Sequence, residues 1–226
     1  MQLQLRTQLW PRCYTFVTIT STNNVDPHSP RVIPPTIVER AVVMTGIGGQ
    51  GIQLIAKLLA QAGIREGRQV MMFGIFMGMI RGGSSESTVV IADQEIVTPP
   101  IVPDVWGVLA MHPEGLPALA RKVRPGGVLV LNSSLVVSPP AWDGVRRIAV
   151  PATELAKEMG QVMAASMIAL GAFAGATGLV AVESLQEALG DVLPPHRRKL
   201  IDTNRHCIRK GAEYVAQRDM GASVPA

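Results

Sequence analysis

The sequence predicts an α/β protein of the Rossmann-like type, with a mostly parallel open sheet and helices on both faces. The first observation is an apolar run at 41–44, followed by the turn Gly46-Ile47-Gly48-Gly49-Gln50-Gly51 and an amphipathic segment at 52–64. This order is typical of a strand, a tight turn and a helix. The second observation is the nearly continuous apolar run at 105–111, which is expected of a strand buried on both faces. The third is the alternation of strand-like and helix-like segments, which favours a parallel sheet.

The elements can be assigned in order from apolar periodicity and from the prolines and glycines between them. The predicted strands cover residues 42–45, 70–73, 87–92, 95–97, 105–111, 128–131 and 146–150. The predicted helices cover residues 52–64 and 114–122, and a helical region runs from Pro151 onward. Strands 87–92 and 95–97 are expected to form a hairpin. Pro113 occupies the first position of its helix, which proline favours.

The last helix is defined by apolar and small residues at helical spacing. These residues are Leu200, Ile201, Asn204, Cys207, Ile208, Gly211 and Val215. The spacing makes Cys207 a thiol of the core rather than a redox group. The basic residues of this helix fall on its other face, which we interpret as a solvated or partner-facing surface rather than a nucleic-acid stripe.

Residues 162–182 contain no charged side chain over 21 positions, which raises the question of a membrane span. The run consists mostly of Ala, Gly, Ser and Thr, and it has no flanking Trp or Tyr belt. We therefore expect a buried helix of small residues that packs closely against a neighbour, with Gly171 and Gly175 on one face.

The composition favours a protein that covers much of its surface with partners. Apolar residues make up 47% of the 226 residues and charged residues only 17%, with 11 Met and a net charge of +4. Ordinary soluble domains carry about 25% charged residues. The two cysteines, Cys13 and Cys207, cannot form a disulfide framework and offer no metal or cluster motif. A reducing cytoplasm is the expected location.

Residues 1–39 look unlike the rest of the chain. They contain five prolines and a centre rich in Ser, Thr and Asn, without a useful apolar period. We interpret this segment as a disordered extension or as the product of an upstream start codon, in preference to a targeting peptide. Residues 40–216 are expected to form a single domain, and residues 217–226 a tail.

The turn at 46–51 satisfies the spacing G-x-G-x-x-G, which has two interpretations. A dinucleotide site normally adds Asp or Glu at the end of the second strand, where it binds the ribose. No acidic residue occurs between Gly67 and Ser85, and Arg81 comes too late to serve NADP. The turn therefore serves either close packing alone or the binding of an anion at the helix start.

Other polar residues are expected at the carboxyl ends of the strands. His112, which precedes Pro113, is interpreted as a helix-start residue rather than a general base, because it has no obvious orienting carboxylate. Ser133 and Ser134 lack a G-x-S-x-G elbow. Lys57 lies too far after the glycines to complete a P-loop. No catalytic residue and no metal ligand is therefore predicted.

A series of motifs in a fixed order carries a resemblance to a known family. After the turn at 46–51 come Ile80-Arg81-Gly82-Gly83-Ser84-Ser85, Val89-Val90-Ile91, Ile96-Val97-Thr98-Pro99 and Pro103-Asp104. Further on come Pro125-Gly126-Gly127, Asn132-Ser133-Ser134, Leu170-Gly171-Ala172, Asn204 and Gly211. This series resembles the gamma subunit, or gamma domain, of the 2-oxoacid:ferredoxin oxidoreductases of the pyruvate, 2-oxoglutarate and ketoisovalerate type. The resemblance covers residues 40–212. One departure is Ala164-Ala165-Ser166, where that family often has an Asn.

The resemblance implies a subunit that supports thiamine-dependent oxidative decarboxylation of a 2-oxoacid to an acyl-CoA. It implies thiamine diphosphate, Mg and [4Fe-4S] clusters on alpha and beta partner subunits, CoA as co-substrate, and a ferredoxin-like electron carrier. This chain would dock on those subunits, shape the CoA side of the site, and be inactive alone. The candidate anion, CoA or partner-facing residues are Gly46, Gly48, Gly49, Gln50, Gly51, Arg81, Gly82 and Gly83.

Two other functions fit the same residues. One is a stand-alone NAD(P)-dependent oxidoreductase, although the ribose-binding acid is missing. The other is a non-enzymatic module for nucleotide sensing or assembly, for which the lack of a catalytic set is equally natural.

Overall fold

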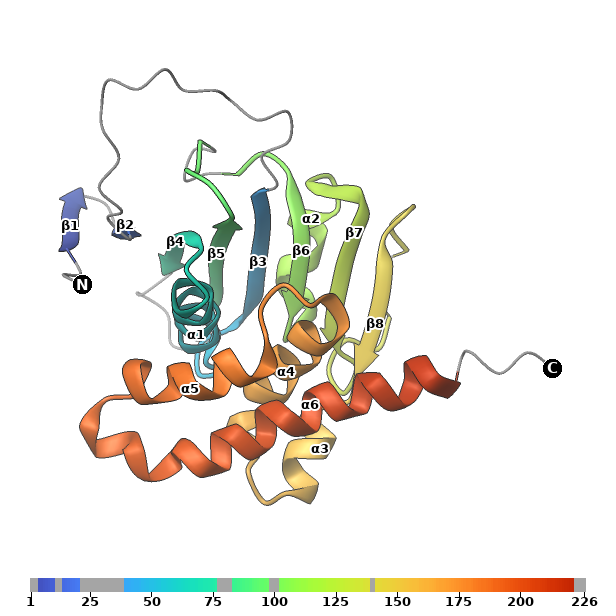
Figure 1. Ribbon diagram of the computed structural model, residues 1–226. Coiled ribbons are helices and arrows are strands. Elements are labelled where there is room, and N and C mark those ends of the chain that lie inside the picture. Colours follow the sequence, from blue (N-terminus) through green and yellow to red (C-terminus); the bar gives the residue numbers. More distant parts are fainter. Residues whose placement is uncertain are drawn as a thin grey trace.

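The computed structural model describes residues 4–10, 14–20, 39–76, 83–97, 102–138 and 141–221. Its eight strands form one sheet in the order β1-β2-β4-β5-β3-β6-β7-β8 (Figure 1). The strands are β1 Gln4–Trp10, β2 Tyr14–Thr20, β3 Glu39–Ile47, β4 Gln69–Phe76, β5 Ser84–Ala92, β6 Val105–Ala110, β7 Val123–Asn132 and β8 Arg146–Val150. The α-helices are α1 Ile52–Arg65, α2 Leu116–Leu119, α3 Ala152–Glu158, α4 Ala165–Thr177, α5 Val182–Val192 and α6 Ile201–Gly221. Three short 3-10 helices are η1 Pro113–Gly115, η2 Val162–Ala164 and η3 Pro195–Leu200.

The sheet confirms the predicted α/β class. Strands β3, β6, β7 and β8 pair in parallel, and β5 runs antiparallel to both β3 and β4. Strand β4 therefore runs in the direction of β3, and α1 is the crossover between them, as the βαβ prediction requires. Because β5 is inserted between β3 and β4, the two strands of that unit are not neighbours.

The predicted hairpin of 87–92 with 95–97 is wrong. Residues 95–97 form no strand, and β5 pairs along its length with β3 on one side and β4 on the other. Both edges of β5 are occupied, so its backbone has no free edge for a third partner. The backbone N–H of Val97 instead donates to Glu39 Oε1 at 2.8 Å.

The helix predicted at 114–122 is shorter than expected. Only η1 and the four-residue α2 form, and Pro117 stands in the first turn of α2, where it has no N–H to donate back to Pro113. Strand β7 then begins at Val123, opposite Val105, so that the predicted strand at 128–131 is the second half of a longer one.

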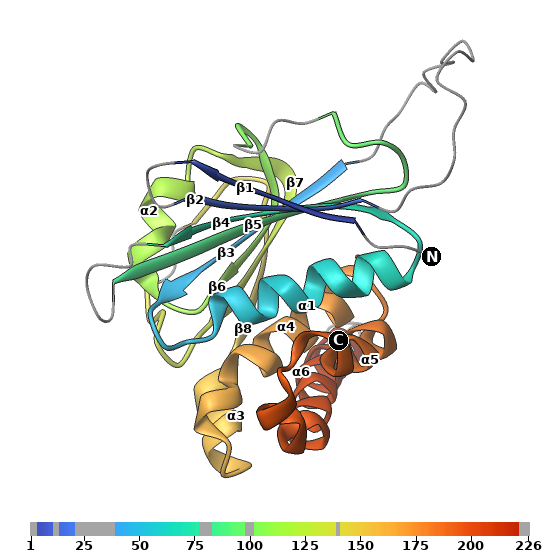
Figure 2. The same cartoon turned by 90° about the vertical axis from the view of Figure 1, so that its left-hand side faces the viewer.

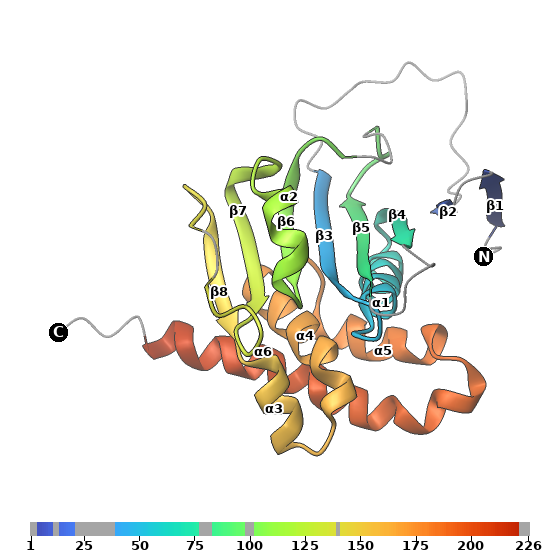
Figure 3. The same ribbon diagram turned by 180° about the vertical axis from the view of Figure 1, so that it is seen from behind.

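Helices lie on both faces of the sheet, but unequally. Helices α1, α4, α5 and α6 cover one face, where Val42 and Met44 of β3 join the larger core. On the other face, Val43 joins a smaller core with Leu116 and Leu119 of α2. Figure 3, seen from behind, shows α2 in front of the sheet and α4 beyond it. Figure 2 shows α1 next to the strands and α6 farther out, on the outer side of α4.

The central part of the charge-free segment, Ala165–Thr177, forms the buried helix that we predicted, whereas Val162 and Met163 precede it and are exposed. Residues 165–174 of α4 are all buried, and α4 packs against α6 through glycines. A Cβ on Gly171 would overlap the carbonyl oxygen of Ile208, and one on Gly211 would overlap that of Ile168. In the described part of the chain, no helix has both the length and the apolar character needed to cross a membrane.

Helix α6 presents the predicted inner face. Asn204, Cys207, Ile208, Gly211 and Val215 are buried, and Ile201 is partly buried. The prediction is wrong for Leu200, which is 40% exposed because it lies in η3, before α6 begins. Burial also raises the pKa of the Cys207 thiol above its usual range, so the thiol stays protonated and serves as a small core residue.

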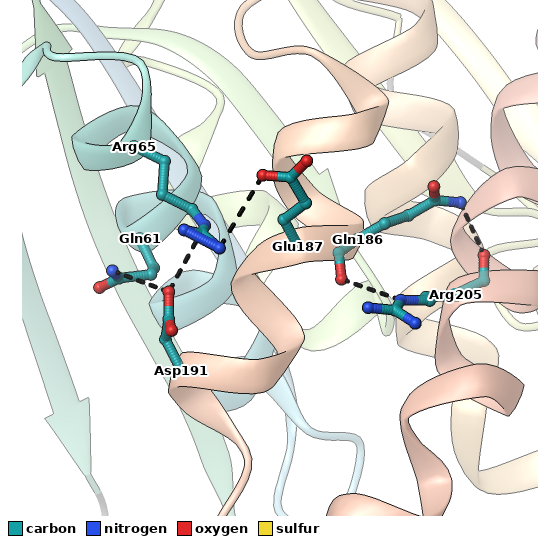
Figure 4. A network of polar contacts seen from close by, with 6 residues as sticks. All are labelled: Gln61, Arg65, Gln186, Glu187, Asp191 and Arg205. Atoms are coloured by element: carbon teal, nitrogen blue, oxygen red, sulfur yellow. Dashed lines mark hydrogen bonds and ion pairs between the residues drawn. The ribbon is translucent and has the colours of Figure 1, made fainter.

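Helix α5 is tied to its neighbours by polar contacts at the surface (Figure 4). Arg65 of α1 reaches Asp191 at 3.4 Å and Glu187 at 3.8 Å. On the other side, Gln186 Nε2 donates to the carbonyl of Arg205 at 3.1 Å. Exposed ion pairs contribute less than about 1 kcal/mol each, so these contacts orient α5 rather than hold the fold.

The N-terminal segment differs from the expectation over two stretches. Strands β1 and β2 form an antiparallel pair, and β2 adds to β4, with Thr18 opposite Met71. The expectation of no strand is therefore wrong for 4–10 and 14–20. The residues 14–20 are aromatic or β-branched throughout, a composition that suits strands, and they cover an edge of β4. Residues 21–38 lie outside the described part.

Candidate functional site

The candidate site lies at the carboxyl ends of the parallel strands, on the lower edge of the sheet in Figure 1. Helix α1 begins just after β3, η1 just after β6, and α3 just after β8. In open α/β sheets this edge is where ligands bind. The glycine-rich turn at 46–51 is at its centre.

The turn ends in a helix start that no side chain covers. Gly49 (φ 96°) and Gly51 (φ 77°) both adopt the left-handed conformation that favours glycine. Gly51 is the N-cap of α1, it makes no side-chain cap, and the first turn of α1 contains no acidic residue. The first amides of the helix therefore have no side-chain cap, and the helix dipole favours an anion at this end.

Gln50, predicted as a ligand residue, holds the turn together. Its Oε1 accepts from the N–H of Ile47 at 2.9 Å, and its Nε2 donates to the carbonyl of Met111 at 3.5 Å. The side chain thus ties the turn to the end of β6. Gly46 leaves room for it, because a Cβ there would lie 2.5 Å from Gln50 Oε1.

The structure brings the second glycine segment beside the first. The N–H of Gly48 donates to the carbonyl of Gly83 at 2.9 Å, and Gly46 pairs with Ser85 in the sheet. Gly48 and Gly83, more than 30 positions apart in sequence, therefore lie at the same edge. Arg81 and Gly82 lie outside the described residues.

One residue beside the glycine turn, Ser166, was not predicted from the sequence. Ser166, in the first turn of α4, is 2% exposed, and its Oγ lies 3.0 Å from the position that a Cβ on Gly51 would occupy. The only signal in the sequence was the departure at 164–166, where the resembling family often has an Asn. Nothing local in that segment pointed to the glycine turn.

The other polar residues of the edge serve the starts of helices. His112 accepts at Nδ1 from the N–H of Glu114 at 3.4 Å, which confirms its helix-start role. Asn132 is fully buried and holds Thr153 through both of its amide atoms, at 2.9 and 3.3 Å. Ser134 Oγ accepts from the N–H of Glu154 at 3.3 Å. These contacts stabilise η1 and α3 rather than activate a nucleophile.

Glu86 lies on β5, opposite Thr45, close to the second glycine turn. Burial raises the pKa of its carboxyl above the usual range, and the Lys122 ammonium partly opposes that rise. Its backbone carbonyl accepts from Gln53 Nε2 at 3.1 Å, which ties α1 to β5. Within the described ranges, no three His, Cys, Asp or Glu side chains are grouped so as to hold a metal ion.

Exposed apolar side chains gather around α3 at the same edge. They are Leu135 (41% exposed), Val137 (85%), Val162 (51%) and Met163 (82%), and we call them the apolar rim. The loop of Leu135 and Val137 follows β7, and the Ser134–Glu154 contact ties it to the start of α3. Val162 and Met163 belong to η2, between α3 and α4. Such a group beside a candidate site favours contact with another protein.

Comparison with known proteins gives a consistent result. The sequence profile described as pyruvate ferredoxin/flavodoxin oxidoreductase matches residues 41–214. The 2-oxoglutarate synthase subunit KorC of Methanothermobacter thermautotrophicus is 32% identical over 188 residues, which cover 80% of this chain and 97% of KorC. The ketoisovalerate oxidoreductase subunit VorA of the same organism is 32% identical over 186 residues, covering 81% of this chain but only 38% of VorA.

Among solved structures, the gamma subunit of the keto/oxoacid ferredoxin oxidoreductase of Geobacter sulfurreducens superposes with a TM-score of 0.69 at 27% identity. The superposition covers 80% of this chain and 98% of that chain. The resemblance to gamma-type chains is thereby confirmed. This chain belongs to the pyruvate ferredoxin/flavodoxin oxidoreductase family.

Proposed function

We propose that this chain is the gamma subunit of a multi-subunit 2-oxoacid:ferredoxin oxidoreductase. The observation that carries the proposal is the family match over residues 41–214. It is joined by the superposition on the gamma subunit of Geobacter sulfurreducens, which covers 98% of that chain. The reaction would be oxidative decarboxylation of a 2-oxoacid to an acyl-CoA, with electrons passed to an iron–sulfur protein. Two cysteines cannot hold a [4Fe-4S] cluster. Clusters, thiamine diphosphate and Mg would therefore be held by alpha and beta partner subunits in the cytoplasm.

The apolar rim supports docking through the edge that carries the glycine turns. Aromatic residues and Met are enriched at protein interfaces, and charged residues are depleted in their centres. Met163, the most exposed large residue of η2, would contact the partner beside Gly51. The edge would then close one side of the active-site mouth of the assembled enzyme.

The glycine segments would face an anionic group in that mouth. Gly46, Gly48, Gly49 and Gly51, together with Arg81, Gly82 and Gly83, would provide backbone N–H groups and one guanidinium. The anion would be a phosphate of CoA or a carboxylate at the subunit interface. Gln50 would contribute by holding the turn in place.

The first test is activity with and without partners. The chain purified alone should show no reduction of viologen that depends on a 2-oxoacid and CoA, because it lacks the groups that carry that chemistry. Co-expressed with the thiamine-binding and cluster-bearing chains, it should co-purify with them and restore activity. Turnover by the chain alone would refute the subunit assignment.

A chain that starts at Val38 should also co-purify with the partners and restore activity. This result is expected if residues 1–39 are an extension, residues 40–216 the domain and residues 217–226 a tail.

Arg81 is the second test. In the assembled enzyme, Arg81→Ala should raise the apparent KM for CoA about ten- to hundredfold, because a charge-assisted contact contributes about 1.5–3 kcal/mol. Arg81→Lys should recover only part of the affinity, since Lys cannot present a planar fork. The measurement is steady-state kinetics with CoA varied. Unchanged KM values for CoA and 2-oxoacid with intact assembly would show that Arg81 contacts no ligand.

A further inference from the structure

The positive charge of this chain is concentrated in one short segment. Residues 196–210 contain six Arg or Lys side chains and one Asp, and therefore carry a net charge of +5. Since the whole chain carries only +4, all its other residues together are slightly acidic. The segment comprises most of η3 and the first half of α6. A charge gathered in this way attracts anionic partners to one end of the molecule.

Three of these cations are both exposed and unpaired. Arg197, Arg198 and Lys199 of η3 are exposed, and they form no ion pair with any residue that the structure describes. Arg205 and Arg209 of α6, in contrast, each have an acidic partner within 3.6 Å. The three residues of η3, which we call the basic turn, therefore carry the charge that the chain itself does not neutralise.

The basic turn has a defined shape and an open position. Leu193, at the end of α5, is 4% exposed, and two prolines separate it from the cations. The N–H of Arg197 donates to the carbonyl of Pro194 at 2.9 Å, which closes the turn. In Figure 1 the connection between α5 and α6 lies at the end of the helical layer that is farther from β8. Charges held on a preformed turn lose little conformational entropy when a partner binds.

The chemistry of the segment favours an acidic protein over a membrane or a nucleic acid. A helix that lies on a membrane presents its apolar face to the lipid, whereas the apolar face of α6 packs against α4. Proteins that bind single-stranded nucleic acid add aromatic side chains for stacking, and residues 196–210 contain no Phe, Trp or Tyr.

The same segment favours an exchangeable partner over a permanent one. Leu200, at 40%, is the only large apolar side chain of residues 196–210 that is exposed. Permanent interfaces are rich in apolar side chains, whereas redox encounters are small and charged pairs chiefly speed their formation. The apolar rim around α3 has the character of a permanent interface, and the basic turn does not.

We propose that the basic turn receives the acidic face of an exchangeable protein, which in the assembled enzyme is the iron–sulfur electron acceptor. This inference rests on the proposed function, in which electrons from the 2-oxoacid leave through clusters on the partner subunits. The acceptor takes those electrons directly from a partner's cluster. The present chain contributes only attraction and orientation, through Arg197, Arg198 and Lys199.

The test compares two electron acceptors in the assembled enzyme, an acidic bacterial ferredoxin and methyl viologen. The variant carries Arg197→Glu together with Arg198→Glu. At low salt its KM for ferredoxin should rise at least about tenfold, because attraction becomes repulsion. Its rate with viologen, a small dication that the basic turn does not attract, should stay within about twofold of wild type. In about 0.5 M sodium chloride the difference in KM should disappear, because salt screens exposed charges.

Two results in the same assay would overturn the inference. One is a KM for ferredoxin that stays at the wild-type level at low salt. The other is an equal loss of the viologen rate, since the basic turn would then serve assembly or catalysis rather than the acceptor.

Arg121→Glu together with Lys122→Glu is the matched control. Both residues are exposed and follow α2, which covers the other face of the sheet. The change in net charge is the same, and the KM for ferredoxin should stay within about twofold of wild type if position matters. A rise equal to that of the η3 variant would mean that net charge alone governs the encounter, and would overturn the site.

A binding measurement separates this inference from the proposed function. A wild-type assembly that oxidises no 2-oxoacid with viologen would refute the proposed function. Ferredoxin binding to the full-length chain alone needs no turnover, and it should be at least about tenfold weaker for the η3 variant than for wild type and the control. Equal binding of all three proteins would refute the inference. Binding of a DNA duplex or of phosphatidylserine vesicles as tight as that of ferredoxin, at the same salt, would refute the assignment to an acidic protein.

Discussion

Replacing Gly211 with alanine is expected to lower the unfolding temperature by about 6–12 °C. The added Cβ would overlap the carbonyl oxygen of Ile168 and approach the amide nitrogen of Ala172 at 2.8 Å, and both atoms belong to the backbone of α4. Backbone atoms in two packed helices cannot move aside as a flexible side chain can. Overpacking of this kind costs about 3 kcal/mol, and each kcal/mol lowers the unfolding temperature by about 2–4 °C in a chain of this length. The measurement is thermal unfolding followed by circular dichroism.

Gly190→Ala is the control for helix propensity. Gly190 lies inside α5, and a Cβ there would meet nothing within 4 Å. This substitution should stabilise the chain by about 0.5–1 kcal/mol, because alanine is the better helix former. If Gly211→Ala behaved like Gly190→Ala, α4 and α6 could not be in backbone contact.

Met163→Asp is expected to weaken assembly with the partner subunits at least about 30-fold while leaving the chain folded. The Met163 side chain is 82% exposed, so a carboxylate there costs the isolated chain little. In a docked edge the same carboxylate would be buried without a partner, and a residue at the centre of an interface contributes about 2 kcal/mol or more. The dissociation constant of the complex, measured by calorimetry or surface binding, gives the effect.

The control for charge alone is Val97→Asp. Val97 is 73% exposed and lies near the start of β3, at the sheet edge opposite the glycine turns. It should assemble with wild-type affinity. Equal loss of assembly in both variants would mean that added negative charge, and not the apolar rim, governs docking.

The parts of the fold that were predictable are those that local sequence determines. Apolar runs predicted β3 and β6, and helical spacing predicted α1. In the turn at 46–51, Gly49 and Gly51 mark positions whose positive φ favours glycine. The order of strands was not local information. That β5 would lie between β3 and β4 depends on pairing across the whole sheet, and this pairing is what excluded the expected hairpin at 95–97.

In the candidate site, too, some residues could be predicted from the local sequence and others could not. The two glycine segments could be named from sequence, and the Gly48–Gly83 contact places Gly83 of the second segment beside the first. Ser166 could not, because 115 positions separate it from Gly51 and only the packing of α4 against the sheet brings them together. The role of Gln50 was likewise hidden, since one of the two backbone groups that its side chain binds, the carbonyl of Met111, lies 61 positions away in the sequence.

The close contact between α4 and α6 also has a consequence for synthesis of the chain on the ribosome. Helix α4 is buried over residues 165–174 and carries no charge, and its outer side is covered by α6. Since the polypeptide emerges from its N-terminus, α4 must wait until Ile208 and Gly211 have been translated before that side can be covered. For that interval an apolar helix is open to water and to neighbouring nascent chains, a state that attracts chaperones and promotes aggregation. Production of this subunit should therefore depend on chaperone supply more strongly than its size alone suggests.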